Sequence, residues 1–253
     1  MENCVVLPQN HQLLSSMTIL RSQNTKGKDF IDAFAKVAAQ LMARALDFIP
    51  VECQQVTTPT GGMYQGVRQA KKVCGISILR AGASLEDALR TAYNGPLSFG
   101  KLLIQRDEKT SLPVHLYTKF PPSISNAYVL ILEPMLATGG SVSKAIELVL
   151  EQRVPEEQII VINLIASASA VSLVSERFPK LTLVTAAVDK DLNSKRLVDN
   201  HICDSTNLSS PIIDKLPTPT GTSIQDWVIS GIDFMVHERI VQKGMEMLEV
   251  RYS

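Results

Sequence analysis

The sequence has no excess of charge of either sign, because its 25 Lys and Arg residues balance its 25 Asp and Glu residues. It therefore lacks the general positive field with which proteins bind nucleic acids or anionic membranes. It has no apolar run close to the roughly 20 residues that cross a bilayer. Its first residues also lack the basic region and apolar core of a secretory leader. We expect no nucleic-acid partner, no membrane association and a cytoplasmic location.

Cysteine is scarce, and paired short spacings typical of zinc sites are missing. The four cysteines are scattered along the chain: Cys4, Cys53, Cys74 and Cys203. This pattern fits buried thiols in a reducing compartment.

The 253 residues, 45% of them hydrophobic, suffice for one sizeable core and are few for two independent domains. We expect a single globular unit with appendages, in which any recognition of an anion is local.

The most informative stretch is Val129–Ser141, where four apolar residues precede an acid, a Gly-Gly turn and a serine. The apolar run predicts a buried strand, and Ser141 predicts the N-cap of a helix that reaches Glu151. A helix start offers unpaired N–H groups and the positive end of the macrodipole, so the stretch predicts a phosphate site. Glu133 follows the strand, where open α/β sheets bind ligands. A strand, turn and helix without a ligand is the plainer alternative.

Two common phosphate motifs are excluded for this stretch. No lysine follows the glycines, as a P-loop requires, and the GxGxxG spacing of dinucleotide-binding folds is missing. Any phosphate would instead be held by backbone N–H groups together with hydroxyl groups such as those of Thr138 and Ser141.

Apolar strand patterns alternate with helical patterns over most of the chain. An arm is expected over residues 5–16, and a helix with Ser84 as N-cap follows a turn that contains Arg80. The remaining strands are expected at 17–20, 51–58, 74–79, 101–105, 114–117, 159–166 and 181–188, and the other helices at 29–48, 142–151 and 168–177. This alternation predicts right-handed crossovers and a mainly parallel α/β sheet.

Several motifs occur together and in a characteristic order: LPQNHQLL with TILR, CGISILRAG, GKLLIQRDE, EPMLATGGS, VPEEQIIVINLIA and VDKDLN. In these motifs the chain resembles uracil phosphoribosyltransferases, particularly the eukaryotic branch, over about residues 5–198. The resemblance implies the type I phosphoribosyltransferase fold, a mainly parallel sheet flanked by helices with a small β hood. It implies a phosphoribosyltransferase domain with an N-terminal arm at residues 1–204 and a divergent, partly helical tail at 205–253.

The implied reaction joins uracil to 5-phosphoribosyl 1-pyrophosphate and yields UMP and pyrophosphate in pyrimidine salvage. By resemblance, the catalytic residues are Arg80, Arg106 and Glu133. The implied substrate-binding residues are Arg80, Arg106, Glu133, Pro134, Met135, Leu136, Ala137, Thr138, Gly139, Gly140, Ser141, Asp189, Leu197 and Val198. Both arginines would hold pyrophosphate, residues 137–141 the 5′-phosphate, and Glu133 the ribose hydroxyls. A Mg²⁺ would be held mainly by substrate and water, without protein ligands. Homo-oligomers and a GTP effector are further expectations from the resemblance.

The sequence departs from the family pattern at two places. Glu133 stands where the family usually has Asp, which keeps the charge. The second is the glycine-rich uracil loop of the form VPGLGDxGDRxFG, where this chain has Leu197–Asp204, LVDNHICD. Three explanations are open: uracil recognition by other means, loss of activity with the sugar-phosphate site kept, or a replaced C-terminal sequence. The alternatives are therefore a catalytically impaired paralogue that binds phosphoribosyl pyrophosphate or nucleotide in a regulatory role, the related domain that follows some uridine kinases, and an oligomerisation scaffold.

Overall fold

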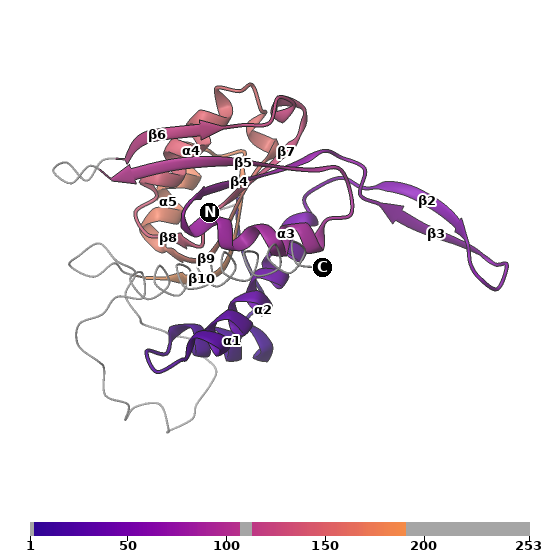
Figure 1. Ribbon diagram of the computed structural model, residues 1–253, viewed down its shortest axis with the longest axis horizontal. Coiled ribbons are helices and arrows are strands. Elements are labelled where there is room, and N and C mark those ends of the chain that lie inside the picture. The colour runs from indigo at the N-terminus through magenta and orange to yellow at the C-terminus, as the bar shows by residue number, and fades with distance from the viewer. Residues whose placement is uncertain (1–2, 107–112, 191–253) are drawn as a thin grey trace, which may run out of the picture.

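The computed structural model describes residues 3–106 and 113–190. An eight-stranded sheet in the order β1-β10-β9-β7-β4-β5-β6, with β8 paired to β9, forms its centre (Figure 1). All neighbouring strands are parallel except β5 and β6. The strands are β1 (Cys4–Val6), β4 (Val73–Leu79), β5 (Leu97–Arg106), β6 (Pro113–Lys119), β7 (Tyr128–Leu132), β8 (Met135–Leu136), β9 (Ile159–Ser167) and β10 (Thr182–Asp189). The predicted, mainly parallel sheet is confirmed.

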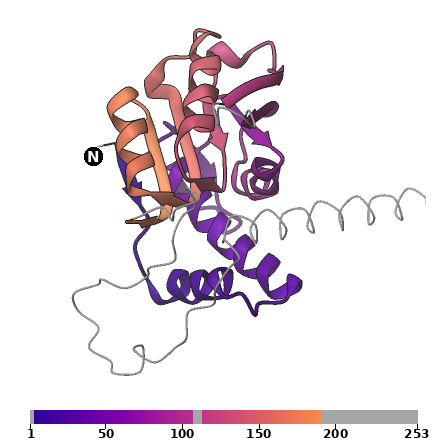
Figure 2. The ribbon, with the colours of Figure 1, turned by 90° about the vertical axis from the view of Figure 1, so that its left-hand side faces the viewer.

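Helices cover both faces of the sheet (Figures 1 and 2). One face carries α1 (His11–Arg21), α2 (Gly27–Leu46) and α3 (Glu86–Ala92), and the other carries α4 (Gly140–Leu150) and α5 (Ala168–Arg177). Short 3₁₀ turns lie at η1 (Ala81–Leu85), η2 (Ile124–Asn126) and η3 (Glu156–Gln158). The central strands are buried on both faces, which explains their unbroken apolar sequence.

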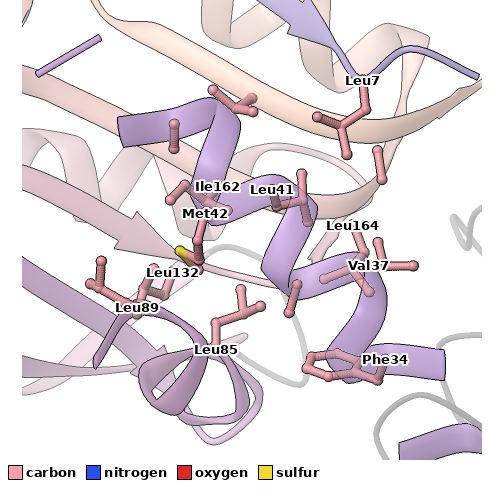
Figure 3. Close-up of a cluster of buried hydrophobic side chains, with 14 of the residues drawn as sticks. Leu7, Phe34, Val37, Leu41, Met42, Leu85, Leu89, Leu132, Ile162 and Leu164 are labelled. Atoms are coloured by element: carbon pink, nitrogen blue, oxygen red, sulfur yellow. The ribbon is translucent and has the colours of Figure 1, made fainter. Parts of the chain in front are cut away.

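The face under α2 shows how helical periodicity builds the core. Phe34, Val37 and Leu41 recur at spacings of three and four residues and are at most 3% exposed. They pack in one cluster with Leu132 of β7 and Ile162 of β9 (Figure 3). Successive residues of β7 from Val129 to Leu132 belong alternately to the two cores, so this strand contacts the helices of both faces.

The strands β2 (Glu52–Thr57) and β3 (Met63–Arg68) form a separate antiparallel hairpin. It projects away from the main sheet (Figure 1). Both strands are exposed along most of their length. Among the described residues it is the only sheet besides the central one.

Helix α1 corrects the prediction of an arm followed by a strand at residues 17–20. It begins after Asn10, whose side chain accepts a hydrogen bond of 2.9 Å from the backbone N–H of Leu13. Leu13, Met17 and Leu20 follow at helical spacing and are buried in the core. The β-branched pair Thr18 and Ile19 favours a strand locally, but burial of this apolar stripe determines the helix.

Candidate active site

Four of the predicted site residues lie at one edge of the sheet, at the carboxyl ends of parallel strands. Arg80 follows β4, Arg106 ends β5, Glu133 follows β7 and Asp189 ends β10. Because β4 is hydrogen-bonded to both β5 and β7, the first three belong to adjacent strands. The predicted residues Leu197 and Val198, and the altered stretch 199–204, lie outside the described residues.

The chain between Glu133 and Ala137 stays attached to β9 after β7 has ended. The carbonyl of Pro134 accepts hydrogen bonds from the N–H groups of Leu164 (2.9 Å) and Ile165 (3.2 Å), and β8 then pairs with β9. Pro134, Met135, Leu136 and Ala137 are buried, whereas Glu133 and Thr138 are half-buried. The four buried residues therefore pack into the core and hold the backbone in place, whereas the side chains of Glu133 and Thr138 are partly open to solvent.

Gly139, and not Ser141, is the N-cap of α4, which corrects the predicted cap. Gly139 has φ +77°, a left-handed conformation that a side chain makes costly. A Cβ at this position would also lie 3.2 Å from Leu173 of α5. Gly140 and half-buried Ser141 become the first residues of the helix. Their backbone N–H groups lie at the positive helix end, as a bound phosphate requires.

Ser167 holds in place the turn that leads from Ala137 to Gly139. It is fully buried at the end of β9, and its hydroxyl donates a hydrogen bond of 2.5 Å to the carbonyl of Ala137. The same oxygen accepts from the N–H of Ala170 at 3.1 Å and so caps α5. Ser167 could have been identified from the sequence, because a serine between a buried strand and a helical pattern predicts an N-cap.

The turn that carries Arg80 is packed directly against the end of β7. Arg80 is exposed, and the 3₁₀ turn η1 follows it. A Cβ built on Gly82 would lie 2.1 Å from the carbonyl oxygen of Leu132, so only glycine fits. Ser84 is not the helix cap that was predicted; its hydroxyl donates to the carbonyl of Ala81 at 2.8 Å, and α3 begins at Glu86. Gly82 thus brings the Arg80 turn against the end of the strand that precedes Glu133.

Asp189 forms a buried, bidentate ion pair with Arg21 at the end of α1. The two guanidinium N–H groups donate to the two carboxylate oxygens at 2.8 and 2.9 Å. The side chains are 7% and 4% exposed. The carboxylate is therefore already bound at both oxygens, and its first role is to join α1 to the sheet edge.

The described residues contain no group of three or more His, Cys, Asp or Glu side chains placed to hold a metal ion. They also contain no helix that is long and apolar enough to cross a membrane.

A mainly parallel sheet with a phosphate-type turn between β7 and α4 and an arginine turn after β4 is typical of type I phosphoribosyltransferases. The family described as "UPRTase: Uracil phosphoribosyltransferase" matches residues 6–207. This chain belongs to the uracil phosphoribosyltransferase family. The match extends across the altered stretch 199–204 as well as the described core.

Named relatives agree with this assignment. The chain is 45% identical over 207 residues to "Uracil phosphoribosyltransferase" of Dictyostelium discoideum, covering 82% of this chain and 95% of the relative. It is 38% identical to "Uridine/cytidine kinase UKL1, chloroplastic" of Arabidopsis thaliana, covering 76% of this chain but 40% of that protein. The solved structure of the AQ2163 protein from Aquifex aeolicus is similar, with a TM-score of 0.66 and 25% identity over 77% of this chain and 91% of that chain.

Proposed function

We propose that this protein is a uracil phosphoribosyltransferase, which forms UMP and pyrophosphate from uracil and 5-phosphoribosyl 1-pyrophosphate in pyrimidine salvage. The observation that carries the proposal is the junction of two turns at one sheet edge. The Arg80 turn packs through Gly82 against the end of β7, from which the turn carrying Glu133 and Gly139 departs. A sugar that carries phosphate groups at both ends needs two such anion sites close together.

The reaction forms a bond between uracil N1 and the anomeric carbon and breaks the bond from that carbon to the pyrophosphate oxygen. The uracil N1 proton is lost, and the electron pair of the broken bond leaves with pyrophosphate. Positive charge develops on the ribose and negative charge on the leaving group. Catalysis therefore needs positioning and charge stabilisation, and no protein nucleophile.

The residues at the edge fit this requirement. The guanidinium group of Arg80, which is exposed, and that of Arg106 are proposed to bind pyrophosphate, because their planar forks match phosphate oxygens. Backbone N–H groups at the start of α4, with the hydroxyls of Thr138 and Ser141, are proposed to bind the 5′-phosphate. The half-buried carboxylate of Glu133 is proposed to accept hydrogen bonds from the ribose hydroxyls.

Mg²⁺ is proposed as the cofactor, bound through substrate oxygens and water. The donor set fits this mode: Glu133 supplies one carboxylate at the edge, and the described part of the chain offers no cluster for an all-protein cage. When bound, the ion would neutralise charge on the pyrophosphate. Glu133 would orient the ribose through its hydroxyls, and Arg80 would hold the leaving group.

A regulatory protein that binds phosphoribosyl pyrophosphate without turnover is the second candidate. It is favoured by one observation, the loss of the Pro and Gly residues of the family's uracil loop at residues 199–204. Calorimetric titration with phosphoribosyl pyrophosphate and Mg²⁺, followed by addition of uracil, separates the two. Binding followed by UMP formation supports the enzyme, binding alone supports the regulator, and absence of both contradicts the proposed site.

A homo-oligomer is proposed as the working form, with the β2–β3 hairpin as its contact. A two-stranded hairpin is marginally stable alone in water, yet this one exposes Met63, Tyr64 and Val67 by 61%, 60% and 65%. Light scattering after size exclusion tests the proposal: Val67→Lys should lower the molecular mass, and Leu173→Lys, on an exposed apolar position of α5, should not. A GTP effector, which rests on the resemblance alone, and a cytoplasmic location, which rests on the scattered cysteines, complete the proposal.

A further inference from the structure

We propose that Glu86 is a positioning residue for the Arg80 turn, although Glu86 lies outside the motif CGISILRAG that contains Arg80. Glu86 is the first residue of α3 and directly follows η1. Its side chain is 15% exposed, and it faces the sheet instead of solvent. This inference rests on the proposed function, because the turn it fixes is the one that carries Arg80.

The carboxylate of Glu86 is bound by two neighbouring strands. The hydroxyl of Ser77 on β4 and the ammonium group of Lys101 on β5 both donate to its Oε1 atom. Ser77 is fully buried, and Ser77 and Lys101 are partners in the β4–β5 register. One carboxylate oxygen therefore attaches the far end of the Arg80 turn to two strands at the same level of the sheet.

The middle of the Arg80 turn, at Gly82, packs against residues of β4 and β7 that are in register with each other. Ser77 is in register with Leu132 on β7, whose carbonyl oxygen is the atom that excludes a Cβ at Gly82. A Cβ on Gly82 would also lie 3.2 Å from the Cα of Ser77. The turn is thus held at its middle by close packing and at its end by Glu86, which leaves Arg80 at its start with little freedom to shift.

The attachment of Glu86 depends on its opposite charge to Lys101. A carboxylate that is mostly removed from water is costly without a cationic partner, and Lys101, 33% exposed, supplies one. Removal of either charge leaves the other without its partner, whereas removal of both preserves neutrality. A Glu86→Gln/Lys101→Met double variant should therefore recover part of what each single variant loses.

The test measures the two substrates separately in the full-length protein. Glu86→Gln should weaken binding of phosphoribosyl pyrophosphate with Mg²⁺, measured by calorimetry, and lower kcat/KM for that substrate by about 100-fold if Arg80 shifts by about 1 Å. The KM for uracil should not change, because the proposed function assigns the Arg80 turn to the pyrophosphate group and not to uracil. Ser77→Ala, which removes a single hydroxyl, should lower the same kcat/KM by about tenfold and leave the KM for uracil unchanged. It provides the test if Glu86→Gln does not fold.

Glu147→Gln is the matched control. Glu147 of α4 also accepts from two cationic side chains, Lys144 and Arg177, and is 29% exposed, but it makes no described contact with the Arg80 turn. Unchanged binding and kinetics in folded Glu86→Gln and Ser77→Ala would overturn the inference, as would equal losses in Glu147→Gln. If the wild-type protein forms no UMP, the proposed function fails, and the calorimetric comparison still decides the role of Glu86.

Discussion

The substitution Gly82→Ala tests the close packing between the two turns of the site. The added Cβ would lie 2.1 Å from the carbonyl oxygen of Leu132, and ordinary contact begins at 3.4 Å. The Arg80 turn must therefore move away from β7 by about 1.3 Å, the difference between these distances. The obstacle is backbone, so a change of side-chain rotamer cannot relieve it.

The expected effects on activity and on folding are of similar size, so they have to be measured separately. A misplacement of about 1 Å costs on the order of 100-fold in rate, equivalent to about 2.7 kcal/mol of transition-state stabilisation. Overpacking lowers the free energy of unfolding by about 1–3 kcal/mol. Initial rates of UMP formation at varied phosphoribosyl pyrophosphate give the first quantity, and urea unfolding gives the second.

Gly62→Ala is the control, because it adds the same methyl group where the nearest atom is the Thr58 side-chain hydroxyl at 3.3 Å. It should leave kcat/KM for phosphoribosyl pyrophosphate unchanged. A folded Gly82→Ala protein with wild-type kcat/KM would refute the reasoning that the Arg80 turn is placed by its contact with β7.

Three further predictions concern the surrounding residues. Asp189→Asn leaves the buried Arg21 guanidinium without a charged partner and should lower the free energy of unfolding by about 3–5 kcal/mol in urea titrations; a loss below 1 kcal/mol would contradict this role. Ser167→Ala removes the cap of α5 and the bond to the phosphate turn, so it should cost about 1 kcal/mol of stability and weaken phosphoribosyl pyrophosphate binding in calorimetry. Burial raises the pKa of the Cys74 thiol above its ordinary 9.0. As pH rises, the thiol therefore ionises in the unfolded chain before it does in the folded protein, and the contribution of Cys74 to the free energy of unfolding should be complete below pH 9 and decrease above it. Mass spectrometry after alkylation at pH 8 should find exposed Cys53 modified and buried Cys74 protected.

Much of the fold was predictable because the buried parallel strands are continuous apolar runs. Residues 159–166 and 168–177 predicted β9 and α5 closely, since strand and helix patterns change at Ser167. Helix α1 was missed because its apolar stripe is short and its β-branched residues favour a strand. The signals that identify it are the cap at Asn10 and the helical spacing of Leu13, Met17 and Leu20.

The candidate site was predictable to the extent that it depends on strand ends. Arg80 and Glu133 follow buried strands, and parallel strands bring their carboxyl ends to one edge. The contacts that hold these residues in place join distant positions, and no local pattern contains them. Arg21 and Asp189 are 168 positions apart, and the contact of Gly82 with Leu132 depends on the order of strands in the sheet.

The most direct test of the account is the initial rate of UMP formation from uracil and phosphoribosyl pyrophosphate with Mg²⁺, compared between the wild-type protein and Arg80→Met. The account predicts UMP formation by the wild-type protein and a loss of about 100-fold or more in kcat/KM for phosphoribosyl pyrophosphate in the variant. Absence of UMP with the wild-type protein, or equal rates for the two proteins, would contradict it.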